Sequence, residues 1–327
     1  MGEARPPAVA RVIERITHTA RTHGMFASDD LVLVWVSGGA DSICLLETMV
    51  RVRRLLRIRL AVFHLNHGLR AGSDGDADYV RRRAAHHGLA CHVARPSAGP
   101  GRGESVEQWA REQRRDAAAR VAVEIGATRS ALGHTMDDRA ETVLLALVRG
   151  WGLDGLTGIE PVAGSFVRPL LDVRRSETQA CCRSLRLRPR LDETNSDTTL
   201  LRNALRHDVI PAMERATGRD VTATIARSAE LLRADASLLD EIATGFADPI
   251  VVVTEGGITL DAAGLNDLAP PIASRVVRRA FADTGLTWSE HAIVGVLDLA
   301  AGRSGRRAEL PNGAVARRDR TSVVIER

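Results

Sequence analysis

Short apolar runs alternate with helical apolar patterns along the first part of the chain. The run Leu-Val-Leu-Val-Trp-Val at 31–36 has no polar interruption, which predicts a strand buried on both faces of a sheet. Further strands are predicted at 59–65, 89–94 and 129–133, and helices at 8–23, 43–50, 75–87 and 105–125. This alternation is typical of a parallel sheet covered by helices. The sequence therefore predicts a doubly wound α/β domain, whose ligands bind beyond the carboxyl ends of the strands.

The pattern changes after about residue 150, where glycine-rich turns replace the alternation. A long helical stretch near 219–243 is interpreted as a connector. Beyond it we predict a hairpin around Glu255-Gly256-Gly257, helices at 271–283 and 289–301, and closing strands at 308–310 and 321–325 around the turn Pro311-Asn312-Gly313. The predicted organisation is a catalytic domain at 1–215, a helical linker at 216–245 and a smaller C-terminal α+β domain at 246–327.

Composition fits a cytoplasmic protein of two domains. The chain has 327 residues, no apolar run long enough to span a bilayer, and no apolar segment at its N-terminus that would predict a signal peptide. The four cysteines form no C-x-x-C pair, so we expect reduced, mostly buried thiols and no zinc site.

Every one of the 45 basic residues is an arginine, and the formal net charge is +4. Guanidinium groups stay charged and fork onto phosphate. The basic excess is modest, and by itself it is weak evidence for a nucleic-acid partner.

The segment Ser37-Gly38-Gly39-Ala40-Asp41-Ser42 lies between the first predicted strand and a helix. Its glycines permit tight turns and close approach of a ligand, and N–H groups at a helix N-terminus form an anion cradle. The hydroxyls of Ser37 and Ser42 can donate further hydrogen bonds. Asp41 suits an anion site only if a metal ion lies between it and the phosphates. A Gly-Gly turn with a serine N-cap is the simpler alternative, but the preceding strand and the Asp-Ser ending favour a phosphate site.

Polar side chains also follow the second and fourth predicted strands. Residues 63–70 read Phe-His-Leu-Asn-His-Gly-Leu-Arg, and residues 133–142 read Gly-His-Thr-Met-Asp-Asp-Arg-Ala-Glu-Thr. A lone histidine such as His64 is more often structural. Asp137 and Glu141 share one face if a helix begins near Asp137, and acidic residues there could simply cap the helix. Three carboxylates, Asp138 included, exceed what capping needs, and they could orient a cationic substrate or a metal.

Two arginine pairs stand at helical spacing. Arg111 and Arg114 are three residues apart on a predicted helix, where a solvated basic face is the alternative. Arg202 and Arg206 lie one helical turn apart after the polar stretch 192–197, and the alternative there is an ordinary polar loop and helix. Forked guanidinium groups at 202 and 206 could bind phosphates.

These segments resemble the motifs of one family. Residues 37–42 resemble the S-G-G-x-D-S pyrophosphate loop of N-type ATP pyrophosphatases, which form adenylates. Residues 64–70 resemble the H-x-N-H-G-L-R signature of tRNA(Ile)-lysidine synthetases, 134–142 their H-x-x-D-D-x-x-E-T motif and 149–159 their R-G-x-G-L-x-G-L-x-G-M stretch. Residues 110–115 resemble A-R-x-x-R-Y with Arg115 in place of tyrosine, and 192–206 resemble D-x-S/T-N-x-D-x-x-Y-x-R-N-x-I-R with Leu200 in place of tyrosine. At this length the chain resembles the short form of the family.

The resemblance implies an adenine nucleotide alpha hydrolase-like fold and an ATP-dependent ligase. The wobble cytidine of the CAU-anticodon isoleucine tRNA would be adenylated with ATP and Mg²⁺, and free L-lysine would displace AMP to give lysidine, changing codon reading from AUG to AUA. A homodimer is left open.

The resemblance also implies roles for individual residues. ATP would bind at Ser37, Gly38, Gly39, Ala40, Asp41, Ser42 and His64, with Asp41 holding Mg²⁺. The catalytic residues would be Asp41, His134, Asp138, Glu141 and Arg202. Lysine and tRNA would contact Asp137, Asp138, Glu141, Arg111, Arg114, Asn195 and Arg206. His134 or a carboxylate could take the proton that the lysine amine loses before attack, and Arg202 and Arg206 could stabilise the adenylated intermediate.

Two other functions compete with this one. A tRNA cytidine thiolase of the same superfamily would share the loop. Such enzymes use C-x-x-C cysteines to hold an iron–sulfur cluster, and this sequence contains no C-x-x-C pair. A non-catalytic ATP-binding sensor would not explain the carboxylate cluster or the arginine pairs.

Overall fold

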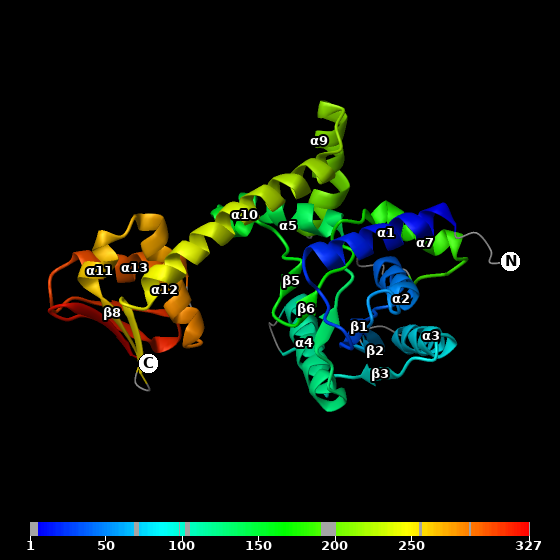
Figure 1. Cartoon of the computed structure of the whole chain (residues 1–327), viewed down its shortest axis with the longest axis horizontal. Coiled ribbons are helices and arrows are strands. Elements are labelled where there is room, and N and C mark those ends of the chain that lie inside the picture. The colour runs from blue at the N-terminus through cyan, green and yellow to red at the C-terminus, as the bar shows by residue number, and fades with distance from the viewer. Residues whose placement is uncertain are drawn as a thin grey trace. The chain divides into compact units, whose positions relative to one another are not determined.

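The computed structural model describes residues 6–68, 72–97, 99–101, 105–190, 201–254, 257–287 and 289–326. The chain divides into two compact units, Met1–Ala229 and Glu230–Arg327 (Figure 1). The division falls within the long helix α10 (Val221–Ala247), inside the segment that the sequence predicts as a linker.

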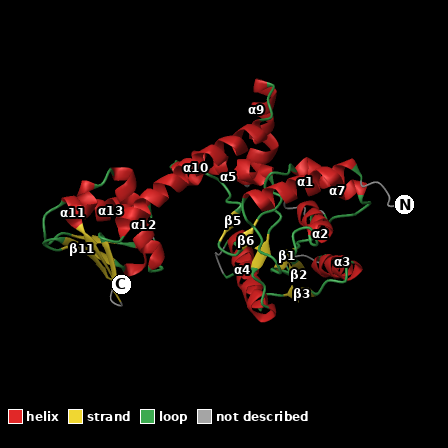
Figure 2. Ribbon diagram, in the orientation of Figure 1, coloured by secondary structure: helices red, strands yellow, loops and turns green. Residues whose placement is uncertain are grey.

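A six-stranded sheet in the order β3-β2-β1-β4-β6-β5 forms the centre of the first unit (Figure 2). Its strands are β1 (Leu31–Trp35), β2 (Arg59–Leu65), β3 (Cys91–Ala94), β4 (Arg129–Ala131), β5 (Val162–Ala163) and β6 (Phe166–Val167). All neighbours run parallel except the edge pair β5 and β6. Because β1 pairs with β2 on one side and β4 on the other, the strand order reverses there, and such a switch point is where ligands bind in open α/β sheets.

Helices cover both faces of this sheet. They are α1 (Pro7–Thr22), α2 (Ala40–Val52), α3 (Ser73–His86), α4 (Val106–Ile125), α5 (Met136–Val148) and α7 (Arg175–Ser184). Val32 and Val34 of β1 join a core with apolar residues of α1, α2, α3 and α7. Leu33 and Trp35, which point to the opposite face, pack against α4. The doubly wound α/β fold predicted from the sequence is confirmed.

The segment before α10 contains a widened helical turn. The short helix α6 (Leu153–Leu156) comes after α5. The short helix α8 (Leu201–Ala204) continues directly into a π-helical turn, η2 (Leu205–Val209), and then into α9 (Ile210–Thr217). Pro211 has no N–H to donate to the carbonyl of His207, so an α-helical bond is lost at this point. The Ile210 N–H donates to the Leu205 carbonyl, which is the bond of a π turn.

The second unit contains a five-stranded antiparallel sheet in the order β7-β8-β11-β10-β9. Its strands are β7 (Val251–Thr254), β8 (Gly257–Asp261), β9 (Arg307–Glu309), β10 (Val315–Arg318) and β11 (Ser322–Glu326). Helices α11 (Ala262–Asp267), α12 (Pro270–Asp283) and α13 (Glu290–Ala301) share one apolar core with the sheet. The hairpin between β7 and β8 is confirmed, although its residues 255 and 256 lie outside the described residues. A Cβ at Gly257 would lie 2.0 Å from the Ile325 carbonyl oxygen, so only glycine fits there.

The predicted pairing of the last strands is wrong. Strand β9 pairs with β10, which the sequence did not predict, and β10 separates β9 from β11. In β10 only Ala316 is buried, and the neighbouring arginines hide the alternation that would have marked a strand. The 3-10 turn η3 (Pro311–Gly313) connects β9 to β10.

Candidate active site

The loop Ser37–Ser42 joins β1 to α2 and closes on the hydroxyl of Ser42. The backbone N–H groups of Ser37 and Gly38 donate to Ser42 Oγ at 3.1 and 3.2 Å, and this hydroxyl donates to the Gly39 carbonyl at 3.0 Å. Gly38 has φ +100°, a conformation that favours glycine. Gly39 is the N-cap and Ala40 the first residue of α2, so the loop lies at a helix N-terminus, where an anion is stabilised.

The end of β4 packs directly on this loop. A Cβ on Gly133 would lie 3.3 Å from the backbone nitrogen and Cα of Ser42. The absence of a side chain at Gly133 therefore fixes how closely β4 approaches the loop.

His64, at the end of β2, lies behind the same loop. Its Nδ1 donates to the Val36 carbonyl at 2.7 Å, and only 4% of its surface is exposed. Burial lowers the pKa of His64, so its imidazole is neutral and Nε2 can accept a hydrogen bond. After the next strand residue, Asn66 donates to Asp74 at 2.8 Å and His67 Nε2 lies 2.9 Å from Arg114 Nη2. Leu69 and Arg70 of the motif lie outside the described residues.

An acid–arginine cluster lies at the start of α5; it consists of Asp41, Asp138, Glu141, Arg175, Arg202 and Arg206. Glu141 is at its centre and is fully buried. It accepts from Arg175 Nη1 at 3.0 Å and from Arg202 Nε at 2.8 Å. Arg206 adds two hydrogen bonds, from Nε at 2.7 Å and from Nη2 at 3.0 Å. Burial raises the pKa of Glu141, but the arginines outweigh burial and lower it.

Asp138 both caps the helix and binds the arginines. Its Oδ2 accepts from the Thr135 N–H at 2.8 Å and from the Thr135 hydroxyl at 2.9 Å, which completes a capping box. Its Oδ1 accepts from Arg175 Nη2 at 2.8 Å and from Arg202 Nη2 at 3.2 Å. The two interpretations of this carboxylate, helix capping and charge recognition, therefore hold together. Burial opposes ionisation, yet Arg175 and Arg202 lower the pKa of Asp138.

Arg175 connects this cluster to the loop. Its Nε lies 3.5 Å from Asp41 Oδ2, while its terminal nitrogens bind Asp138 and Glu141. Asp41 also accepts a hydrogen bond from the Thr178 hydroxyl. Burial raises the pKa of Asp41 in spite of these partners, so a further cation near this carboxylate would be stabilised. The loop and the carboxylates therefore form one continuous site.

Asp137, also on α5, contacts the backbone at the start of α7 instead of the guanidinium groups of the acid–arginine cluster. Its Oδ2 accepts from the Arg175 N–H at 2.8 Å and lies 3.4 Å from Arg174 Nε. The pair that shares guanidinium partners is Asp138 and Glu141, rather than the Asp137 and Glu141 pair that the spacing predicted.

His134 lies in a positively charged part of the site. Arg168 Nε donates to its Nδ1 at 3.2 Å, and burial, with Arg168, Arg202 and Arg111 nearby, lowers the pKa of His134 to about 4. The imidazole is therefore neutral at pH 7, and its Nδ1 lone pair is already used. This geometry argues against His134 as the base that the sequence suggested, and leaves its Nε2–H as a hydrogen-bond donor.

Four residues of the site were missed in the sequence: Arg168, Arg174, Arg175 and Thr178. Arg168 follows β6, and the other three lie at the start of α7, which packs on α1 and α2. The available signal was the pair Arg174-Arg175 at a helix start, where positive charge opposes the helix dipole unless acidic side chains lie close. Asn195, predicted to contact substrate, lies outside the described residues.

Within the described ranges, no group of three or more His, Cys, Asp or Glu side chains could hold a metal ion. Mg²⁺ commonly binds through one or two carboxylates together with substrate phosphates, so Asp41 alone would suffice on the protein side.

The predicted free thiols are confirmed, with Cys44, Cys181 and Cys182 buried.

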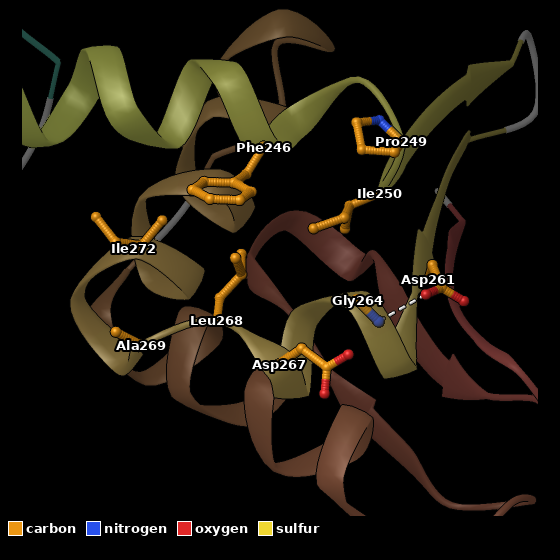
Figure 3. A pocket seen from close by; sticks show the side chains of 9 residues that line it. All are labelled: Phe246, Pro249, Ile250, Asp261, Gly264, Asp267, Leu268, Ala269 and Ile272. Atoms are coloured by element: carbon orange, nitrogen blue, oxygen red, sulfur yellow. Dashed lines mark hydrogen bonds between the residues drawn. The ribbon is translucent and has the colours of Figure 1, made fainter.

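The second unit contains a hollow of about 500 Å³ between the end of α10, α11 and α12 (Figure 3). Its lining is mainly apolar, with Phe246, Ile250, Leu268 and Ile272, and the Asp261 carboxylate at its edge accepts from the Gly264 N–H at 2.6 Å. Asp261 therefore caps α11.

Among the helices that the structure describes, none has the length and apolar character needed to cross a bilayer.

Comparisons with known proteins match a different family model to each of the two units. A model described as a PP-loop domain matches residues 9–213, and one described as a TilS substrate binding domain matches residues 260–323. The tRNA(Ile)-lysidine synthase of Cutibacterium acnes is 33% identical over 98% of this chain and 96% of its own length. That of Dehalococcoides mccartyi is 36% identical over 91% of this chain but only 66% of its own length.

The chain spans about three fifths of the length of several other curated relatives. Among solved structures, the U34-tRNA thiolase NcsA from Methanococcus maripaludis has a similar fold. Its TM-score is 0.58 at 17% identity, over 69% of this chain and 79% of that one.

Proposed function

This chain belongs to the tRNA(Ile)-lysidine synthase family, and from that membership we propose that it ligates free L-lysine to carbon 2 of the wobble cytidine in an isoleucine tRNA with a CAU anticodon. The observation that supports this most is the contact of Arg175 with Asp41 on one side and with Asp138 and Glu141 on the other. It joins a phosphate-binding loop to a carboxylate cluster, which a two-step reaction at one place requires.

The first step would be adenylation of the base. The cytidine oxygen on carbon 2 attacks the α-phosphorus of ATP, and pyrophosphate leaves. The N–H groups of Ala40, Asp41 and Ser42, in the first turn of α2, would hold the β- and γ-phosphates, because those of Ser37 and Gly38 already donate to Ser42 Oγ. The guanidinium groups of Arg175, Arg202 and Arg206 are already fixed by Glu141, so they would meet developing negative charge without reorganisation.

The second step would be attack by the lysine ε-amine on carbon 2, with departure of AMP. Binding of the lysine by Asp137, Asp138 and Glu141 stays a prediction. Because Glu141 already carries four guanidinium hydrogen bonds, an ammonium group could reach it only by displacing an arginine. Asp138 likewise accepts four hydrogen bonds, so Asp137, whose side chain is 19% exposed, is the most accessible of the three for a cation.

Mg²⁺ would lie beside Asp41. The side chain of this residue is 26% exposed, and since burial raises its pKa, a cation beside it would favour the ionised carboxylate. A bound Mg²⁺ would neutralise charge on the triphosphate. The residues of the chain would then hold the nucleotide, through the loop and Asp41, and orient its α-phosphorus.

The partner would be tRNA. The reacting base must leave the anticodon stack to reach the loop, as in other enzymes that modify a base. Arginines in both units would hold the RNA backbone, so affinity should fall steeply with salt. We place the reaction in the cytoplasm, and the homodimer remains a prediction that light scattering would test.

Labelled lysine tests the proposal directly. Incubated with ATP, Mg²⁺ and a transcript of the isoleucine tRNA, the protein should transfer label to the RNA and release pyrophosphate. Asp41→Asn should abolish pyrophosphate release, whereas the matched control Asp78→Asn, at an exposed carboxylate that pairs with Arg81 on the same helix, should leave it unchanged. Transfer of sulfur instead of lysine would indicate a thiolase, and ATP binding without turnover would indicate a sensor; either would refute the proposal.

A further inference from the structure

Trp151 is an exposed aromatic side chain on the turn that follows α5. It keeps 53% of its surface exposed, whereas Trp35 and Trp109 keep 9% and 5%. Helix α5 carries Asp137 and Asp138 at its other end. The 13 residues of this helix span about 20 Å, so Trp151 lies about one helix length from the active site.

The indole is held in place by its surroundings. The backbone N–H of Trp151 donates to the Ala146 carbonyl at 2.9 Å, and the preceding Gly150 has φ +70°. A Cβ on Gly155 would lie 2.6 Å from Trp151 Cβ and 3.1 Å from its Cε3. Glycine at 155 therefore makes room for the indole beside α6.

A cation accompanies this ring. The Arg149 guanidinium carbon lies 5.5 Å from the centroid of the Trp151 ring. An unpaired nucleobase stacks well on an aromatic side chain, and a neighbouring arginine can pair with its phosphate or stack as well. A purely apolar partner would gain nothing from the guanidinium. Trp151 stands at the position that the R-G-x-G-L motif leaves open.

We propose that Trp151 and Arg149 form a stacking platform for an unpaired nucleobase of the tRNA anticodon loop, other than the base that reacts. The proposal rests on the proposed function. The distance from the active site assigns the platform to a nucleotide some positions away from the reacting cytidine.

Binding of the tRNA transcript to single variants tests the platform. Trp151→Ala should weaken binding about 5- to 150-fold, the range for loss of one base stack, while Trp151→Phe should keep most of the affinity. The matched control Leu147→Ala, at an apolar residue that is 61% exposed on the same helix end, should change it less than twofold. In turnover, Trp151→Ala should raise KM for tRNA with kcat unchanged.

Salt separates the two members of the platform. The factor lost in Trp151→Ala should be the same at low and at moderate salt, because stacking is uncharged. Arg149→Gln should lower the slope of log affinity against log salt by about one. Gly155→Ala, which displaces the indole without removing it, should weaken binding in a protein that still contains Trp151.

Several outcomes would overturn the inference. Suppose that the wild type binds the tRNA, and that Trp151→Ala has an unchanged melting temperature and binds it equally well. The platform is then refuted, while the proposed function stands. If the wild type binds no tRNA, the proposed function itself fails. If Leu147→Ala and Trp151→Ala weaken binding equally, or Trp151→Ala turns a dimer into a monomer in light scattering, the surface binds protein instead.

Discussion

Replacing Glu141 by glutamine removes the charge on which three guanidinium groups converge. The carboxylate is fully buried and accepts four hydrogen bonds of 2.7–3.0 Å from Arg175, Arg202 and Arg206. Glutamine keeps the volume, but it offers a single acceptor oxygen and turns an NH₂ group toward N–H donors. The change therefore leaves buried positive charge without its partner.

The expected loss of stability is large. Removing one partner of a buried ion pair costs about 3–5 kcal/mol. Asp138 still accepts from Arg175 and Arg202, at 2.8 and 3.2 Å, so we expect a value near the lower end. That is a large share of the roughly 5–15 kcal/mol that separates a folded domain from its unfolded state.

The dependence on pH has a definite sign. Because the folded-state pKa of Glu141 lies below the ordinary value of 4.5, its contribution is fully present above that pH and is lost as the pH falls toward the lowered pKa. The stability difference between the wild type and Glu141→Gln should therefore be constant from pH 8 to pH 6 and shrink below pH 4.5.

Urea unfolding and pyrophosphate release, measured on the same preparations, test this reasoning. Glu47→Gln is the matched control, since its carboxylate is 1% exposed and binds Arg51 at 2.8 Å, Arg83 at 3.1 Å and His87 at 2.9 Å, none of which belongs to the acid–arginine cluster. Both variants should lose stability, but only Glu141→Gln should lose pyrophosphate release per folded molecule. A Glu141→Gln protein that unfolds like the wild type and shows only a raised KM for lysine would refute the arrangement described here, because the carboxylate would then serve the substrate instead of the arginines.

Three further predictions concern single positions. Arg175→Met should slow pyrophosphate release at least 100-fold, about 3 kcal/mol at the transition state, while nucleotide affinity changes less, and stopped assays with saturating ATP would measure it. Gly133→Ala should weaken ATP binding about tenfold in calorimetry, about 1.4 kcal/mol, because its Cβ would press on the Ser42 backbone, and an unchanged affinity would contradict the packing of β4 on the loop. The imidazole of His134, with its pKa lowered to about 4, should show no titration between pH 8 and pH 5.5 in NMR, and a midpoint near the ordinary 6.5 would contradict its burial.

The backbone of the first unit follows from the sequence to within a few residues. The run at 31–36 and the glycines after it predict β1, the loop and α2, because those signals are local. The carboxylates of α5 were likewise predicted, together with the helix start near Asp137.

The partners of these carboxylates could not be predicted in the same way. Arg175 is separated from Asp138 by 37 positions and from Asp41 by still more, and periodicity does not report which helices meet. A cationic substrate was the expected neighbour of Asp138 and Glu141, whereas the chain supplies its own cations. Strand β10 was missed for a related reason, since its arginines mask the buried Ala316.

The π turn at Leu205–Val209 makes this part of the site sensitive to the number of residues as well as to their kind. A π turn is an α-helix with one residue inserted. Because the widened turn absorbs that residue, deleting one residue after Arg206 would restore α-helical register and leave the following helix in about its present orientation. Deleting one residue between Arg202 and Arg206 would instead rotate Arg206 by about 100° relative to Arg202, so the two keep Glu141 as a common target only while the spacing between them stays the same.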